Sequence, residues 1–240
     1  MDLNQYYQSL VLSSEATLNE SVKRMDQLAN VNTFVDDLLT WHRVIHTKVG
    51  ATVIKYAAGE IQLSTLSLVY GLYRQAFVSL RLSFELSLSA IFFSNNELEF
   101  REWERGKRDI YWSQLIDTTN ETDNGVLSKR YAKAFFPELE GIVKEYNQLA
   151  KDTYRSLSEF VHGNAYTWEM NTSSVVFDQD LFNRWMDSFS HVSRVISFSL
   201  SLRFIKALEP HEISLLEAHL QEYLGTIAAI RKIVGGTVEA

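Results

Sequence analysis

The chain has 240 residues, which suits one compact domain, and its hydrophobic content of 46% excludes a disordered or fibrous protein. Ten glycines and two prolines are too few to supply the turns of a β-sandwich or barrel of this length. The composition therefore predicts an all-α fold, formed as a single helical domain over residues 1–240. The formal net charge of −7 argues against a protein that holds nucleic acid by general attraction to its phosphates, but it leaves room for a small basic pocket.

Three features of the sequence predict a cytoplasmic protein that does not enter a membrane. The chain has no cysteine, which fits a reducing compartment. Residues 1–5 lack the basic start and the apolar run of a signal peptide. The most apolar stretch, residues 61–93, is interrupted by Arg74, Arg81 and Glu85, whose charges would be costly in lipid. We therefore interpret this stretch as a buried helix.

Hydrophobic residues spaced three and four apart predict a succession of helices. In the first half of the chain we expect helices over about residues 4–29, 33–59 and 60–93, and a fourth helix that contains residues 100–115. In the second half we expect helices over about 127–135, 138–162, 178–208 and 211–234. The expected breaks lie at residues 30–32, Gly59, the polar loop 117–126, Pro137 and Pro210. Residues 164–177 are β-branched and aromatic without a helical period, which fits either a short hairpin or an irregular flap.

His42 and His46 are the first candidates for chemistry, because a spacing of four residues on a helix points both imidazoles the same way. Zinc-binding helices use this spacing. No glutamate follows His42 as a hydrolase base would, however, and no third ligand is evident. We interpret the pair as ordinary surface or boundary residues, and we predict no metal and no other cofactor.

Arg81 and Glu85 lie one helical turn apart in the most apolar segment, where a charged group needs a partner. One interpretation is a buried ion pair that fixes the register of packed helices. The other is that an arginine lines a cleft and binds an anionic ligand. The sequence does not separate these two interpretations.

Arg155 and His162 are the strongest candidates for a functional site. They are seven residues apart on one expected helix, so their side chains lie within about 20° of each other and about 10 Å apart along the axis. Gly163 is a natural end for this helix, which places His162 in the last turn. There the negative end of the helix and the nearby Glu159 both favour the protonated imidazole, which suits proton transfer at neutral pH.

Arg155, six intervening residues and His162 match the R-x(4–6)-H motif of the HEPN superfamily of small helical bundles, at the long end of its spacing. The chain also resembles uncharacterised bacterial HEPN-like helical proteins. These combine a long central helix, similar to residues 72–86, with a later Tyr-Arg-x-x-Ser-x-x-x-His-Gly/Pro segment, which is found here at residues 154–163. The resemblance implies an up-down helical bundle over roughly residues 60–165, with additional helices at both ends.

The resemblance further implies a metal-independent endoribonuclease that acts as a homodimer on RNA. Such proteins serve in toxin–antitoxin or anti-phage defence systems, so an antitoxin or defence partner protein is expected. By the same resemblance, His162 would be the general acid and base for attack by the ribose 2′-hydroxyl, and Arg155 would hold the phosphate. The surrounding polar residues are candidates for supporting roles: Tyr154, Ser156, Glu159 and Asn164.

Two alternatives compete with this interpretation. In the first, Arg155 pairs with Glu159 and His162 caps its helix, so that both residues serve only the fold. In the second, the chain is a non-enzymatic module that binds a partner protein or senses a nucleotide through a degenerate site, as many members of the superfamily do.

Overall fold

The computed structural model describes residues 2–116, 124–162, 164, 167 and 175–235. The structure is 80% helical, and no strand occurs among these residues. The predicted all-α class is therefore confirmed. The expected hairpin or flap at 164–177 falls mostly outside the described residues, as does most of the polar loop 117–126.

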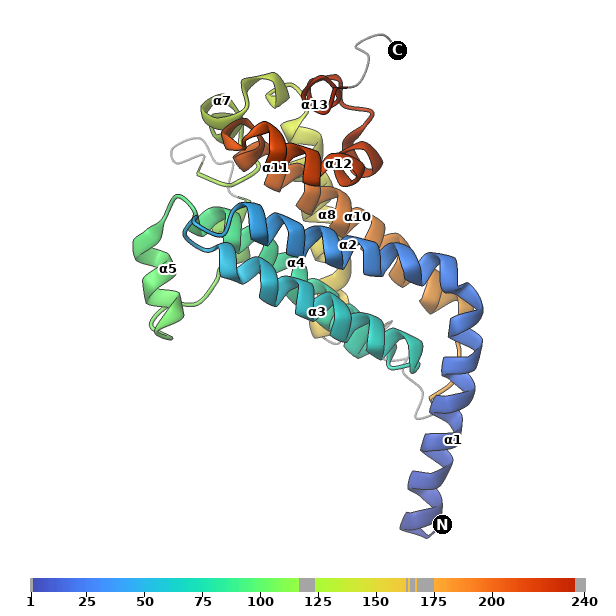
Figure 1. Ribbon diagram of the computed structural model, residues 1–240. Helices are drawn as coiled ribbons and strands as arrows, with labels where there is room; N and C mark the ends of the chain where they lie inside the picture. Colours follow the sequence, from blue (N-terminus) through green and yellow to red (C-terminus); the bar gives the residue numbers. More distant parts are fainter. Residues whose placement is uncertain (1, 117–123, 163, 165–166, 168–174, 236–240) are drawn as a thin grey trace.

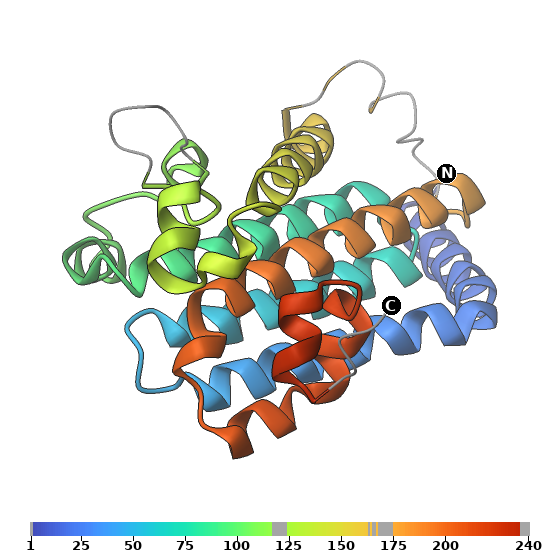
Figure 2. The ribbon, with the colours of Figure 1, turned by 90° about the horizontal axis from the view of Figure 1, so that it is seen from above.

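Five long helices make up the body of the molecule (Figure 1). They are α2 (Met25–Val44), α3 (Ala51–Val69), α4 (Tyr73–Phe93), α8 (Val143–His162) and α10 (Gln179–Phe204). Seen from above, α2, α3, α4 and α10 run side by side along roughly one direction (Figure 2). α4 contacts α3, α8 and α10, and α8 also packs along α10. The core of the molecule therefore surrounds α4.

Shorter helices cover the ends of this body. After α4 come α5 (Glu97–Glu104), α6 (Trp112–Leu115) and α7 (Lys129–Phe135). After α10 come α11 (Pro210–Leu215), α12 (Glu217–Leu224) and α13 (Ala228–Ile233). Single 3-10 turns lie at Val22–Arg24, Pro137–Leu139 and Ile205–Ala207. Helix α1 (Leu3–Ser21) stands away from the body (Figure 1).

The expected central helix over residues 60–93 is wrong, because the chain turns back within it. Gly71 takes a left-handed conformation with φ of 75°, which glycine adopts without the steric cost that a Cβ brings. A Cβ at this position would also lie 3.0 Å from the side chain of Thr17. As a result α3 and α4 form a closely packed helical hairpin.

Other helix ends also differ from the sequence-based expectations. The first break falls at Val22–Arg24 rather than at residues 30–32, which lie inside α2. Gly59 lies inside α3 and does not end it. The last expected helix, 211–234, is three short helices, although Pro210 does stand in the first turn of α11 as expected.

α4 is the one helix among the described residues that is long and apolar enough to cross a membrane. In the structure 72% of its most apolar window is buried. Its serines allow this close packing, since Ser83 donates a hydrogen bond across to the Ala57 carbonyl of α3 (2.8 Å). The expectation that this segment is a buried helix is confirmed for α4.

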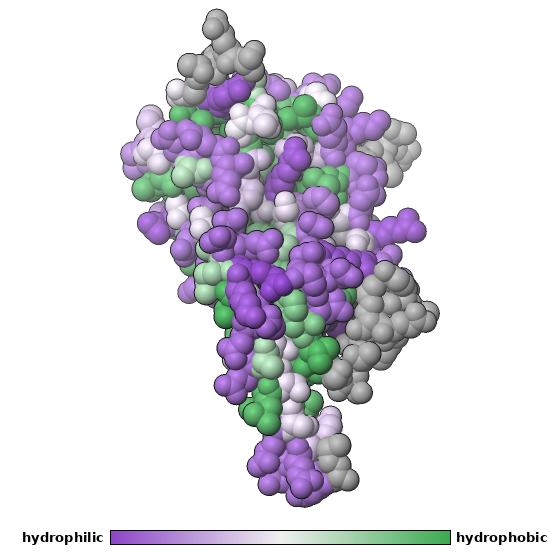
Figure 3. Space-filling model, turned by 90° about the vertical axis from the view of Figure 1, so that its right-hand side faces the viewer, coloured by the Kyte–Doolittle hydropathy of each residue, from purple (hydrophilic) through white to green (hydrophobic). Residues whose placement is uncertain are grey.

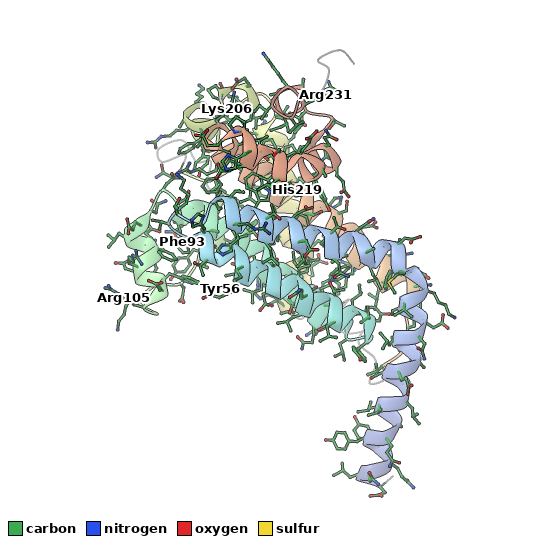
Figure 4. All side chains as sticks on the ribbon, in the orientation of Figure 1. Tyr56, Phe93, Arg105, Lys206, His219 and Arg231 are labelled. Carbon is green, nitrogen blue, oxygen red and sulfur yellow. The ribbon has the colours of Figure 1, made fainter. Side chains whose placement is uncertain are left out.

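A buried polar pair joins the C-terminal helices to the body. His219 of α12 points toward α2 (Figure 4), and its Nδ1 lies 2.9 Å from Oδ2 of Asp37. The His219 side chain is 1% exposed, and its ring packs between those of Phe34, Trp41 and Tyr223. Nε2 of His219 has no hydrogen-bond partner among the described residues. The contact with the Asp37 carboxylate is therefore the one hydrogen bond found there for this imidazole.

We expect Asp37→Ala to lower the free energy of unfolding by about 1–3 kcal/mol, because it leaves a buried imidazole with no hydrogen bond. Urea denaturation followed by circular dichroism measures the change. The matched control is Asp36→Ala, since Asp36 is the exposed neighbour on the same helix. Equal stability of the two variants would show that the pair between His219 and Asp37 contributes nothing.

Candidate functional site

α8 has one apolar and one polar face, and this pattern decides which of its side chains reach solvent. The buried face packs against α4 and α10 and comprises Val143, Tyr146, Asn147, Ala150, Thr153, Leu157 and Phe160. Arg155 and His162 lie on the opposite face, and both are exposed. Two turns of helix separate them, so their side chains leave α8 in nearly the same direction. The structure therefore presents the predicted pair on one exposed ridge.

Neither Arg155 nor His162 has a hydrogen-bond or ion-pair partner among the residues that the structure describes. Glu159, which lies between them, binds Arg184 of α10 instead, with 3.4 Å between Oε2 and Nη2. The Arg184 guanidinium also lies 4.9 Å from the centre of the Phe160 ring. Among the described residues the Glu159 carboxylate thus pairs with Arg184, and no ion pair between Arg155 and Glu159 is found.

The end of α8 is held by the residues that follow it. α8 ends at His162 as expected, whereas Gly163 lies outside the described residues. The backbone amide of Asn164 donates to the backbone carbonyl of Glu159 (3.4 Å). The backbone carbonyl of Asn164 accepts from the backbone amide and from the hydroxyl of Thr167, both at 2.8 Å. The backbone of Asn164 is thus hydrogen-bonded to Glu159 and Thr167, and a supporting role of Asn164 in the site stays a prediction.

Arg81 and Glu85 form an ion pair, with 3.8 Å between Nη2 and Oε2 and side chains that are 19% and 15% exposed. The hydroxyl of Tyr154 stands between them, because it accepts from Arg81 and donates to Oε1 of Glu85 (3.2 Å). Arg81 also donates to the hydroxyl of Ser158 (3.1 Å). The pair therefore ties α4 to α8 through the hydroxyls of Tyr154 and Ser158, and a supporting role of Tyr154 in the site stays a prediction.

Burial of Tyr154 raises the pKa of its phenol above the ordinary value of 10.0, and the nearby Glu85 carboxylate raises it further, while Arg81 opposes the shift. The Trp112 ring stacks on the Tyr154 ring at 3.7 Å with 4° between the planes. Because the folded pKa is raised, the neutral phenol stabilises the fold fully below pH 10, and this contribution is lost as the pH rises through the raised pKa. At neutral pH the network is intact.

An open groove of about 440 Å³ runs between α8 and α10, beside the ridge of Arg155 and His162. Ser156, the residue after Arg155, lines it. The other lining residues are Leu149, Asp152, Thr153, Arg184, Asp187, Ser188 and His191. Two carboxylates, a guanidinium, an imidazole and three hydroxyl groups therefore face one open space, which suits a ligand with several hydrogen-bonding groups.

Arg184 and His191 of this groove were not predicted as site residues, although they too are separated by six residues. The signal was present in the sequence as a second arginine and histidine at the motif's spacing. What the sequence does not show is that α10 packs against α8 and brings Arg184 to Glu159.

His42 and His46 do not lie on one helix, because α2 ends at Val44. Nδ1 of His42 lies 3.1 Å from the Ala51 carbonyl, and Nδ1 of His46 lies 2.8 Å from the Arg43 carbonyl. A carbonyl only accepts, so both Nδ1 atoms carry hydrogen. The shallow groove that they line also contains Arg43 and Lys55, whose charges disfavour a cation. No group of three or more metal-binding side chains is found in the described part of the chain.

No protein-family model, curated protein or solved structure matched this chain. The resemblance to HEPN proteins therefore stays a prediction, and the functional proposal rests on the exposed positions of Arg155 and His162 on α8.

We expect Tyr154→Phe to lower the free energy of unfolding by about 1–2 kcal/mol, because it removes the hydroxyl that links Arg81 to Glu85 within a partly buried contact. Tyr111→Phe is the matched control, since the Tyr111 side chain is 53% exposed. Urea denaturation at pH 7 measures both variants. A Tyr154→Phe protein as stable as the control would contradict a structural role for this network.

Proposed function

We propose that the chain is a metal-independent endoribonuclease of a bacterial toxin–antitoxin or anti-phage defence system, acting as a homodimer. One observation carries this proposal. Arg155 and His162 extend from the same exposed face of α8, and neither is engaged by another described residue. A guanidinium and an imidazole that both reach solvent are the groups that phosphodiester cleavage without a metal needs.

The chemistry assigned to each residue follows from its side chain. His162, acting as general base, takes the proton of a ribose 2′-hydroxyl, whose oxygen then attacks the adjacent phosphorus. The bond from phosphorus to the 5′-oxygen breaks, and the protonated His162, acting as general acid, gives that proton to the leaving 5′-oxygen. Arg155 binds the phosphate and stabilises the charge that builds on its oxygens in the transition state. The products are a 2′,3′-cyclic phosphate and a 5′-hydroxyl.

The groove between α8 and α10 supports this proposal because of where it lies. It begins at Ser156, directly beside Arg155, and its polar lining offers hydrogen bonds to a ribose or a base. A nucleotide next to the cleaved bond would therefore find polar partners. Since the chain as a whole is acidic, such local contacts have to supply the binding energy for RNA.

A non-enzymatic protein-interaction module is the second candidate function. The observation that favours it is the exposed apolar face of α1, which has little of the chain beneath it. A module of this kind would use its helical faces and would leave Arg155 and His162 without a chemical role.

We expect the purified protein to cleave RNA in the presence of EDTA and to leave 2′,3′-cyclic phosphate ends. His162→Ala and Arg155→Ala should each reduce the cleavage rate at least about 100-fold, because each removes a group that acts in the transition state. Gel analysis of end-labelled RNA measures the rate. Expression of the active protein should also arrest growth, and either substitution should relieve the arrest without loss of soluble protein.

The matched controls are His211→Ala and Arg105→Ala, which remove the same side chains at exposed positions on α11 and after α5. Both control proteins should keep the activity of the unchanged chain. Cleavage that persists in His162→Ala, or that requires a divalent metal, would overturn the proposed mechanism. Absence of any cleavage would favour the interaction module.

A further inference from the structure

α1 leaves the body of the molecule and extends away from it (Figure 1). Of its nineteen residues only Thr17 and Ser21, in the last two turns, are buried. Thr17 is fixed to the body, because its hydroxyl donates to the Val175 carbonyl (3.5 Å) and its methyl group lies near Gly71. The free part of α1, residues 3–14, is short enough that it would be only marginally stable in water as an isolated helix, so a surface to pack against would stabilise it.

The face of α1 that packs on the body continues beyond it and becomes exposed. Six residues at intervals of four and three share this face: Leu3, Tyr7, Leu10, Ser14, Thr17 and Ser21. Exposure rises along the face, from buried at Ser21 to 59% at Tyr7 and 68% at Leu3. Tyr6 and Val11 border it and are 42% and 65% exposed. Figure 3 shows apolar residues along this free part of α1.

α3 carries a second uncovered apolar stripe, and its end lies near the base of α1. Tyr56, Leu63 and Leu66 recur at helical spacing on its outer face and are 52–54% exposed. Leu72, in the turn after α3, is 46% exposed. In Figure 1, α3 forms the lower edge of the body and α1 descends beside the end of α3, so the two helices form one corner of the molecule.

We propose that a second copy of this chain occupies that corner, with α1 of each copy packed against the outer face of α3 of the other. Exchange of two different helices across a two-fold axis covers both apolar surfaces in both copies. More than half of the large exposed apolar side chains among the described residues belong to α1, to α3 or to the turn after α3. Apolar patches of this extent are typical of interfaces.

Charge favours a second copy as the occupant. Residues 3–14 contain no charged side chain, and neither do residues 61–72, although the chain has a net charge of −7. The α3 stripe includes one charged residue, Glu60, between Tyr56 and Leu63. It would meet the uncharged face of α1, so two acidic copies can meet there without like charges in contact. A membrane is disfavoured, because helices that lie on lipid carry lysine or arginine on their polar face, and α1 carries neither.

This dimer does not rest on the proposed ribonuclease activity, but it has a consequence for the ridge on α8. Arg74, three residues beyond Gly71, donates a hydrogen bond to the Thr167 hydroxyl (3.3 Å), just after the end of α8. The base of α1, the end of α3 and the end of α8 therefore lie at one end of the body. The proposed interface thus lies at the end of the body where α8 ends in each copy.

Light scattering and sedimentation should show a dimer of the full chain at micromolar concentration. Leu10→Glu and Leu63→Glu should each weaken the dimer at least about tenfold, because each places a carboxylate in an apolar contact. Leu12→Glu is the matched control on α1, since the two leucines are two residues apart and face opposite sides of the helix. Gln62→Glu is the matched control on α3, where Gln62 is the exposed neighbour of Leu63.

The helical circular dichroism of every variant should match that of the unchanged chain, because all four positions are partly or fully exposed. A monomeric full chain would overturn the proposal, as would a dimer that Leu10→Glu and Leu63→Glu leave intact. Equal weakening by Leu12→Glu would overturn the assignment of the face. Binding of a monomeric chain to neutral lipid vesicles would show that the apolar surface serves a membrane instead.

Discussion

The contact between α4 and α8 fixes the rotation of α8 about its own axis. That rotation decides whether Arg155 and His162 face solvent or the core. The Phe77 and Phe160 rings stack at 3.8 Å with 9° between their planes, one turn from the network that joins Arg81 to Tyr154. Aromatic stacking and a partly buried charge both require close geometry. Since a rotation of α8 would break both, the helix is held with Arg155 and His162 outward.

α10 lies antiparallel to α8 and restrains it from a second side, by contacts near both ends of α8. Near its end, α8 binds Arg184 through Glu159 (3.4 Å). Near its start, the Tyr146 ring stacks on the Phe198 ring at 3.7 Å, and the Tyr146 hydroxyl accepts from Arg194 (3.3 Å). The groove lies between these two points. Its polar lining is therefore held on a rigid pair of helices, which positions side chains more precisely than a loop does.

Composition and helical periodicity were sufficient to predict the all-α class and the face of α8 that reaches solvent, because neither depends on how the helices pack. They were not sufficient to place the turn at Gly71, since residues 61–93 are mainly apolar and one glycine is a weak signal within such a run. The partner of Glu159 could not be predicted either. Arg155 is one turn away in the sequence, whereas Arg184 is 25 residues away and depends on how the helices pack.

The same distinction between local and tertiary information explains α1. The spacing predicted one helix over about residues 4–29, and a helix with an apolar face is ordinarily assumed to pack on its own domain. In the structure, buried positions of α1 occur only at Thr17 and Ser21, and no described part of the chain covers the face as far as Leu3.

The proposed cleavage of RNA by an acidic chain has to overcome a general repulsion, because the net charge is −7. A single ridge offers one guanidinium and one imidazole to the phosphate backbone. In the proposed dimer the second copy contributes a second guanidinium, and attraction to phosphates grows with the number of contacts made. Residues 3–14 and 61–72 carry no charge, so the proposed contact between copies does not set acidic side chains of these segments against each other. The ridge on α8 and the apolar faces of α1 and α3 are separate observations, and each proposal can fail without the other.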